Sequence, residues 1–340
     1  MNSFAPEKCH NHILSSLKPS LAFEPDKDFG QWRSQAKQAL LDVLGTLPEK
    51  SDLNIHIEYE KEHSGYKETR FVFTSEPHAD VPCHLLIPQA GQPPYPAVIC
   101  LQGHMPGMHL SLGRAKYDGD EDLIKAGDKD YALQAVRHGY AALVMEQRCF
   151  GERKDCRPED VATFGRGCHH ASMAALLLGR TMIGERVWDV SRAIDALAEL
   201  SNIDIEKIGC MGNSGGGTIT YFAACIDERI RIAMPSCYVC TWRESISQID
   251  HCEDNYLPGA LRYFDLPDLT GLIAPRPMVI VAGRKDTIFP IGGVEKAFKT
   301  IRQIYAAAGV PDKCRLVIGE EGHRFYADMS WPVFKELSSW

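Results

Sequence analysis

The chain has 340 residues, 44% of them hydrophobic, and a formal net charge of −8. That length can bury a large core, and an acidic chain without a Lys/Arg cluster is not attracted to a phosphate backbone, so nucleic acid is excluded as the expected partner. The first residues, Met1 to His12, are polar rather than a secretory signal, and no apolar run approaches the roughly 20 residues that span a bilayer. We therefore expect a cytoplasmic protein with no membrane partner.

The first 50 residues predict a helical extension. Its apolar residues recur at roughly helical spacing: Phe29, Trp32, Ala36, Leu40 and Leu44. The Leu47-Pro48 pair then closes the segment. Three alternating stretches follow at residues 55–59, 68–74 and 83–87, and they predict antiparallel edge strands.

From Pro96 onward, short apolar runs alternate with helical segments. The predicted strands lie at 97–101, 141–145, 208–211, 230–234, 277–282 and 314–318. The predicted helices lie at 130–138, 187–200, 218–226, 294–308 and about 326–337. This alternation predicts a mainly parallel central sheet flanked by helices, which binds ligands at the carboxyl ends of its strands. Residues of about 149–185 and 241–275 interrupt the alternation, and we expect these two long insertions to form walls or lids.

Twelve cysteines are scattered along the chain, and several, such as Cys100 and Cys210, lie in predicted strands. In a long chain without an export signal, this pattern favours buried free thiols over disulfides. The one C-x-x-C, from Cys237 to Cys240, has no second pair at zinc spacing, so a redox or metal role is not assigned to it.

The sharpest motif is Gly212-Asn-Ser-Gly-Gly216, a G-x-S-x-G between a predicted strand and a predicted helix. A nucleophilic serine requires this placement, because a tight strand-to-helix turn with small neighbours lifts its hydroxyl clear of the sheet. A dinucleotide-binding loop would instead lie at the first strand–helix turn and read G-x-G-x-x-G. The motif therefore predicts Ser214 as the nucleophile.

Two further residues follow later strands in the order that such a nucleophile needs, first an acid and then a histidine. Asp286 follows the strand at 277–282, and His323 follows the strand at 314–318. We expect His323 to act as the base and Asp286 to orient it. The other acids near enough to compete are Glu320, Glu321, Glu253 and Asp254.

An oxyanion hole needs two backbone N–H donors. We expect one from Gly215, the residue after the nucleophile, and one from His104 in the loop after the strand at 97–101, with Met105 as the second choice. His104 and nearby His109 are conceivable as a metal pair, but the sequence shows no third ligand. We therefore expect no metal and no organic cofactor.

These residues resemble the α/β-hydrolase superfamily from about Asn54 onward, and within it the acetyl-xylan-esterase-like and dienelactone-hydrolase-like branch. The matching segments are Leu101 to Gly107, Glu146 to Gly151, Leu178 to Ile183 with Trp188-Asp189, Gly212 to Gly217, and Gly322 to Phe325. The resemblance implies that Arg148 anchors loops by ion pairing. Gln102 stands where many relatives have histidine, and Asn213 stands where His, Gln or Tyr often precedes the serine.

The resemblance implies an α/β-hydrolase fold, with the N-terminal helical extension at residues 1–50 and the catalytic domain at 51–340. It implies a serine esterase that cleaves acetyl or other small carboxylic esters through an acyl-enzyme, with a small-molecule ester as its partner. A serine amidase or peptidase of the prolyl-oligopeptidase type, cleavage of a lactone or carbon–carbon bond, and a catalytically silent binding protein are the alternatives. The N-terminal helical segment either covers the core or meets a second subunit in a homo-oligomer.

Overall fold

The computed structural model describes residues 4–154, 167–200 and 202–340. Two helices come first, α1 (Pro6–Ser16) and α2 (Phe29–Leu44). The strands are β1 (His56–His63), β2 (Tyr66–Glu76), β3 (Ala79–Pro88), β4 (Tyr95–Leu101), β5 (Ala141–Met145), β6 (Ile203–Asn213), β7 (Ile230–Ser236), β8 (Met278–Gly283) and β9 (Cys314–Gly319). The later helices are α3 (Asp120–Gly127), α4 (Tyr131–Arg137), α6 (His169–Leu177), α7 (Met182–Glu199), α8 (Gly215–Ile226), α9 (Ile291–Ala307) and α10 (Ala327–Ser338).

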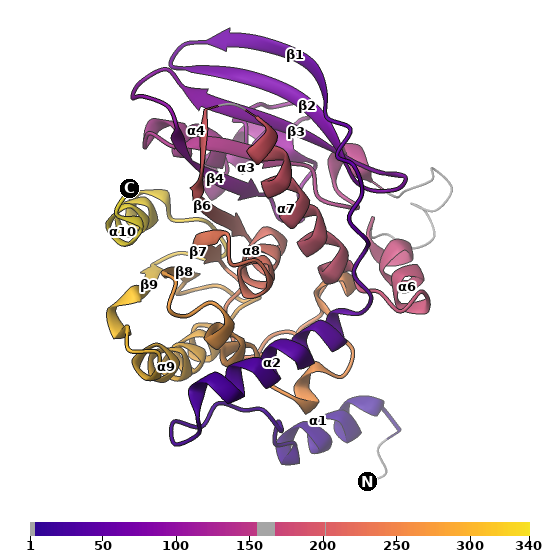
Figure 1. Cartoon of the computed structure of the whole chain (residues 1–340). Coiled ribbons are helices and arrows are strands. Elements are labelled where there is room, and N and C mark those ends of the chain that lie inside the picture. Colours follow the sequence, from indigo (N-terminus) through magenta and orange to yellow (C-terminus); the bar gives the residue numbers. More distant parts are fainter. Residues whose placement is uncertain (1–3, 155–166, 201) are drawn as a thin grey trace.

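Within the described residues, the strands form one sheet in the order β1-β2-β3-β5-β4-β6-β7-β8-β9 (Figure 1). The first three strands pair antiparallel, and β3 also runs antiparallel to β5. Every pair from β5 through β4 to β9 is parallel. The predicted α/β-hydrolase fold, a mainly parallel sheet flanked by helices, is confirmed, and so are the antiparallel strands at its edge.

Helices cover both faces of the sheet. Successive side chains of a strand point to opposite faces, so a strand that is apolar throughout needs cover on each face. Ala97, Ile99 and Leu101 of β4 point into a core that also contains residues of α2, α7, α8 and α9. Val98 and Cys100 point into the opposite core, together with residues of α4 and α10. Because β4 to β9 run parallel, they end at one common edge of the sheet. Loops from both insertions meet there.

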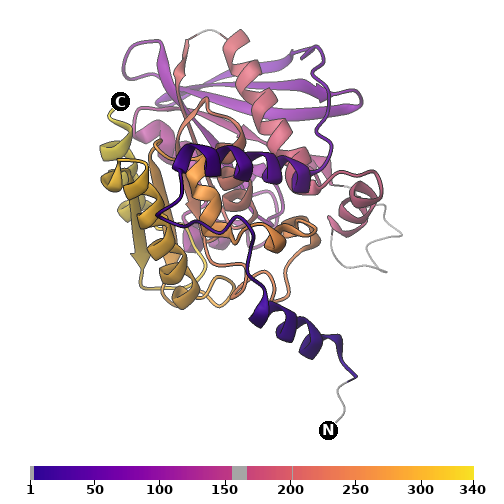
Figure 2. The ribbon, with the colours of Figure 1, turned by 60° about the horizontal axis from the view of Figure 1, so that its bottom comes forward.

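The two N-terminal helices differ in burial. In α2, the Asp28 side chain accepts a hydrogen bond from the N–H of Gln31 at the start of the helix, and Trp32 and Leu40 are buried in the core. Trp32 lies against Gly271, where an added Cβ would overlap the indole ring. By contrast, α1 has no buried residue and stands away from the sheet (Figure 2). The division of the chain at residue 50 stays a prediction.

The two insertions contain mostly short helices. The first includes η2 (Gly151–Arg153), α6 and the start of α7; its residues 155–166 lie outside the described part of the chain. The second includes η3 (Glu253–Asn255), η4 (Ala260–Arg262) and η5 (Leu266–Leu272). The expectation of free thiols throughout is wrong at one pair: Cys168 and Cys252 form a disulfide that joins the two insertions. The pair is separated by 84 residues, and its contact comes from loop packing that no local pattern reveals.

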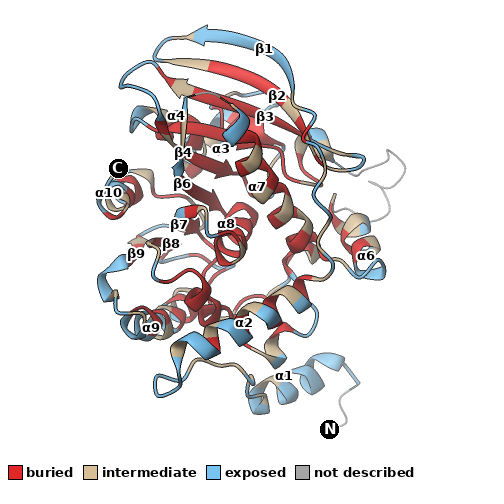
Figure 3. Cartoon of the chain, viewed as in Figure 1, coloured by how far each residue is buried: buried red, intermediate tan, exposed pale blue. Residues whose placement is uncertain are grey.

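The outer edge of the sheet is solvent-exposed. Seven of the eight residues of β1 are exposed, and the strand carries Glu58, Glu60, Lys61 and Glu62 (Figure 3). Its register with β2 shifts between Ile57 and Tyr59. Across the described residues, no helix is both long and apolar enough to cross a bilayer.

Candidate active site

Ser214 lies on a sharp turn between β6 and α8, as the motif predicts. Its backbone has φ 58° and ψ −123°, a conformation that costs a non-glycine residue on the order of 1–3 kcal/mol. Glycine neighbours make the turn possible, because an added Cβ at Gly216 would overlap the carbonyl oxygen of Leu101. The N–H of Ser214 donates to the carbonyl of Ser236 at 2.9 Å, which ties the turn to the end of β7.

Asn213, which departs from the pattern of the related family, has a structural partner. Its Oδ1 accepts a hydrogen bond from Ser236 Oγ at 2.8 Å, and both side chains are buried. The amide therefore links the ends of β6 and β7 beneath the nucleophile.

Asp286 and His323 lie in the loops after β8 and β9, and the structure brings them together. Asp286 Oδ2 and His323 Nδ1 are 2.7 Å apart. Burial alone would raise the pKa of Asp286, but hydrogen bonds from His323 and from the backbone N–H groups of Ile288 and Phe289 lower it below its ordinary value. The imidazole stacks on the Phe289 ring with centroids 5.9 Å apart and remains partly exposed. The carboxylate is thus held in its charged form and fixes the orientation of the histidine.

Cys237 lies between this pair and the nucleophile turn, and no catalytic or positioning role was predicted for it. It directly follows Ser236, and its Sγ lies within 4.8 Å of the facing side-chain atoms of Asp286 and His323. Burial raises the pKa of the thiol, which donates to the carbonyl of Arg324 at 3.2 Å. The position just past a buried strand was the one available signal for it. Cys240 is a separate free thiol, so the C-x-x-C carries no disulfide.

The loop after β4 presses against the serine turn. An added Cβ at Gly103 would lie 2.6 Å from the carbonyl oxygen of Asn213 and 2.9 Å from Ser214 Cβ. The next residue is His104, and its Nδ1 lies 3.1 Å from the position that a Cβ of Gly215 would take. The two residues predicted to supply oxyanion donors are therefore neighbours in space.

Glu146, directly after β5, holds the loop after β4 through hydrogen bonds. Its carboxylate accepts hydrogen bonds from Gln102 Nε2, from the N–H of Met108 at 3.1 Å and from the N–H of Glu152 at 3.3 Å. Burial raises the pKa of Glu146 to about 7 against these hydrogen bonds. Gln102, the second departure from the pattern of the related family, thus has a defined partner.

His104 has an acid partner of its own, which sequence reasoning missed. Its Nε2 lies 3.0 Å from Oδ2 of Asp254, a buried residue of η3. Asp254 was a candidate acid for the triad, but the structure places it on His104. Arg186 Nη1 donates to the same oxygen at 2.6 Å, and its guanidinium lies 4.3 Å from the centre of the Phe150 ring. Burial would raise the pKa of Asp254, but the charge of Arg186 and the hydrogen bond with His104 lower it to about 2.

The remaining candidates lie elsewhere. Glu320 and Glu321 are exposed and pair with Arg284 and Lys285. His109 is buried against Asp120, 2.8 Å from its carboxylate, so it does not pair with His104 as a metal ligand. Arg148 contacts Glu76, Glu185 and Asp189, which confirms the prediction that it anchors loops by ion pairing.

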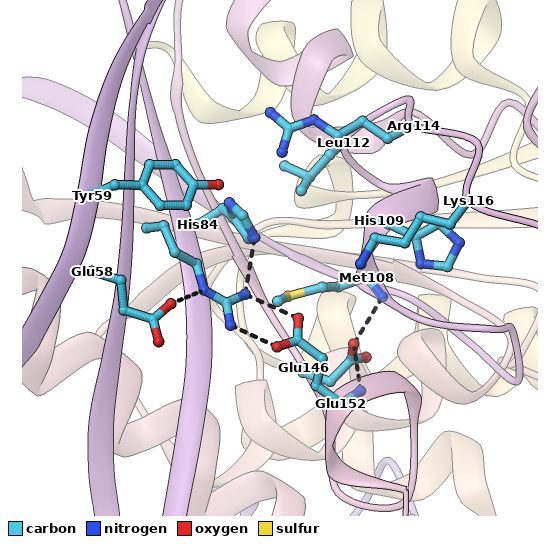
Figure 4. A pocket seen from close by; sticks show the side chains of 11 residues that line it. Glu58, Tyr59, His84, Met108, His109, Leu112, Arg114, Lys116, Glu146 and Glu152 are labelled. Atoms are coloured by element: carbon cyan, nitrogen blue, oxygen red, sulfur yellow. Dashed lines mark hydrogen bonds and ion pairs between the residues drawn. The ribbon is translucent and has the colours of Figure 1, made fainter.

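Two cavities flank the loop after β4. One of about 480 Å³ is lined by His104, Met105, Phe150 and Cys168. The other, of about 320 Å³, lies beyond Glu146 and is shown in Figure 4. There the Arg70 guanidinium donates to Glu58 and Glu152, so these three charged groups of the wall pair with one another.

The sequence matches the Abhydrolase family over residues 7–325. YtaP of Bacillus subtilis (strain 168), a candidate hydrolase, is 25% identical over 321 residues, which cover 91% of this chain and 99% of that protein. The 4-O-methyl-glucuronoyl methylesterase of Phanerochaete carnosa is 26% identical over 228 residues, or 58% of this chain and 54% of that protein.

Solved structures share the fold. A candidate acetyl xylan esterase from Bacteroides fragilis superposes with a TM-score of 0.78 at 17% identity, covering 99% of this chain and 90% of that one. A glucuronoyl esterase from Solibacter usitatus superposes with a TM-score of 0.72 at 14% identity, covering 95% of this chain and 97% of that one.

Proposed function

The chain belongs to the Abhydrolase family. From the family and the geometry of the site, we propose that it is a serine-dependent carboxylic-ester hydrolase that acts on acetyl or other small esters. The observation that carries the proposal is the strained backbone of Ser214 at the carboxyl edge of the sheet, where the Asp286–His323 pair also lies. The names of the relatives, an acetyl xylan esterase and glucuronoyl esterases, support an ester and a carbohydrate as the substrate class.

The reaction proceeds in two steps. Ser214 Oγ attacks the ester carbonyl while His323 Nε2 takes its proton, and the alcohol leaves with that proton. Asp286 holds the imidazole through Nδ1 and stabilises its charged form. Water then attacks the acyl-enzyme with His323 again as the base, which releases the acid and restores the serine.

The oxyanion that forms in each step is bound by the backbone N–H groups of Gly215 and His104. Two observations support this role: Gly215 begins α8, whose amino end favours negative charge, and Gly103 is packed against the turn. Loss of one such donor typically costs about 10²–10³ in rate.

The test is labelling by a fluorophosphonate probe together with hydrolysis of a panel of p-nitrophenyl esters of rising acyl length and of matched peptide amides. We expect labelling and rapid cleavage of the acetyl ester by the wild-type protein. Ser214→Ala should abolish labelling and lower kcat by several orders of magnitude while the protein remains folded by circular dichroism. The control Ser34→Ala, at an exposed position of α2, should behave as wild type.

Three results would contradict the proposal in different ways. Labelling of Ser214→Ala would place the nucleophile elsewhere. Absence of both labelling and ester cleavage in the wild-type protein would favour a silent binding protein. Faster cleavage of amides than of esters would favour an amidase of the prolyl-oligopeptidase type.

A further inference from the structure

Four side chains of metal-binding type meet beside the nucleophile turn, where the two insertions contact the loop after β4. They are His104, Cys168, Cys252 and Asp254, and one ligand atom from each lies within 4.8 Å of all the others. They come from three segments far apart in the chain: the loop after β4, the residue before α6, and the start of η3. Imidazole, two sulfurs and a carboxylate form a ligand set that suits zinc.

The separations agree with tetrahedral coordination. Zinc lies about 2.3 Å from sulfur and about 2.0–2.2 Å from nitrogen or oxygen, so tetrahedral angles put a nitrogen ~3.6 Å from a sulfur and ~3.3 Å from an oxygen. His104 Nε2 is 3.9 Å from Cys168 Sγ and 3.0 Å from Asp254 Oδ2. The nitrogen and the oxygen would therefore need shifts of only a few tenths of an ångström. The two bonded sulfurs would have to separate after reduction, because two sulfurs on one tetrahedral zinc ion lie ~3.8 Å apart.

We propose that the reduced protein binds one zinc-class divalent cation through His104, Cys168, Cys252 and Asp254. In the structure the two sulfurs are joined as a disulfide. A dithiol reductant supplies the two electrons that break this S–S bond, and the reductant itself becomes a disulfide. The protein thiols then lose their two protons to solvent as the cation binds the thiolates. A small-molecule disulfide that accepts two electrons from the thiolates would re-form the S–S bond, become a dithiol itself and release the ion.

The surroundings balance the charge of such a site. Two thiolates and one carboxylate carry three negative charges. The cation carries two positive charges, and the Arg186 guanidinium, 2.6 Å from Asp254, supplies the third positive charge. Asn255 Nδ2 donates to Asp254 Oδ1 at 2.9 Å, so the carboxylate is held from both sides. Hydrogen-bonded carboxylates of this kind are the usual support around bound metals.

The proposed ion would act on the active site through His104. Metal on Nε2 leaves the proton on Nδ1, and Nδ1 is the atom that lies beside Gly215. Four protein ligands close the coordination sphere, so the site would be structural rather than a source of activated water. It would fasten α6 and η3 to the loop after β4 and hold a fixed N–H donor beside Gly215.

The test uses the full chain, reduced under anaerobic conditions with a dithiol and then freed of the reductant. Zn²⁺ or Co²⁺ is added in slight excess, unbound ion is removed by gel filtration, and metal is counted by mass spectrometry. We expect one ion per chain, a cobalt–thiolate charge-transfer band, and protection of two thiols from alkylation. Cys252→Ser should lose the band and weaken binding by more than the about 10–100-fold typical of outer-shell changes.

The matched control is Cys9→Ser, because Cys9 is an exposed free thiol in α1; it should bind one ion like the wild type. If Cys252→Ser fails to fold, Asp254→Asn provides the same test with both sulfurs intact. Less than a tenth of an ion per reduced wild-type chain would overturn the proposal. Full metal retention in Cys252→Ser or Asp254→Asn would also overturn the proposal. So would a disulfide that survives reduction, which would leave two cysteines unreactive to alkylation even without metal. None of these readouts depends on esterase activity, so the proposed function stands or falls separately.

Discussion

The carboxylate of Asp286 and the imidazole of His323 face each other at 2.7 Å, although 37 residues separate them in the chain. This contact fixes the tautomer of the histidine, because Nδ1 must carry the proton that the carboxylate accepts. Nε2 is then the nitrogen left to take a proton from a serine hydroxyl.

Asp286→Asn should therefore lower kcat by about 10⁴-fold with little change in the fold, since the amide favours the wrong tautomer. The measurement is kcat for a p-nitrophenyl acetyl ester, with thermal unfolding as the check on folding. Glu320→Gln is the matched control, because Glu320 is exposed and pairs with Arg284; it should keep wild-type activity. Equal losses in both variants would remove Asp286 from the triad.

Glu146 should make the protein less stable as the pH rises. Its pKa is raised by burial from 4.5 to about 7, so the folded state keeps the proton longer than the unfolded chain. Its contribution to stability is complete below about pH 4.5 and is lost as the pH rises through about 7. Urea unfolding should show the wild-type stability, measured relative to Glu146→Gln, falling by about 3 kcal/mol between roughly pH 4 and pH 8.

Glu152→Gln provides the control for this pH effect. Burial would raise the pKa of Glu152, but Arg70 lowers it below its ordinary value, so its contribution is lost as the pH falls and not as it rises. The stability of Glu152→Gln should still fall above pH 5. A wild-type stability that changes in parallel with that of Glu146→Gln over the whole range would contradict the prediction.

Arg186→Met should destabilise the protein by about 3–5 kcal/mol, because it leaves the Asp254 carboxylate buried without its main countercharge. Urea unfolding of the reduced protein without added metal measures the loss. Arg231→Met removes an exposed pair with Glu206 and should cost no more than about 1 kcal/mol. A cost below about 1 kcal/mol at Arg186 would mean that water reaches Asp254.

Gly216→Ala should reduce kcat/KM by about 100-fold, because its Cβ would overlap the Leu101 carbonyl and move the nucleophile turn against the loop after β4. Gly292→Ala is the control: it lies in α9 with open space around it, and alanine should leave activity unchanged and stabilise the helix by up to about 1 kcal/mol. Kinetics and thermal unfolding of both variants measure the effects. Wild-type activity in Gly216→Ala would show that the turn tolerates the shift.

The sheet was predictable because its strands are continuous apolar runs, and a run such as residues 97–101 can be stable only when covered on both faces. The residues of the proposed triad could be singled out for a related reason: each follows one of these runs, and parallel strands end at one edge. Helix ends were less well predicted. The helix expected at 187–200 begins at Met182, because the Thr181 side chain accepts the N–H of Gly184 and starts it earlier.

The surroundings of His104 could not be predicted in the same way. Arg186, Cys252 and Asp254 reach it from helix and loop segments distant in the chain, through side-chain contacts that leave no periodic pattern. Both insertions contain cysteine, histidine and acidic residues, but their positions in the sequence indicate no common site. The same reason explains the disulfide that the sequence did not predict.

The exposed strand β1 has a consequence for how copies of the chain meet in concentrated solution. Its outer side presents backbone groups that a strand from another molecule would pair with, which is the usual route to fibrils. An incoming copy of β1 would have to meet a strand rich in charged side chains, and the irregular register near Ile57 disturbs the pairing edge. Charged side chains and an irregular register are features that disfavour strand-to-strand pairing at such an edge, where no helix covers it among the described residues.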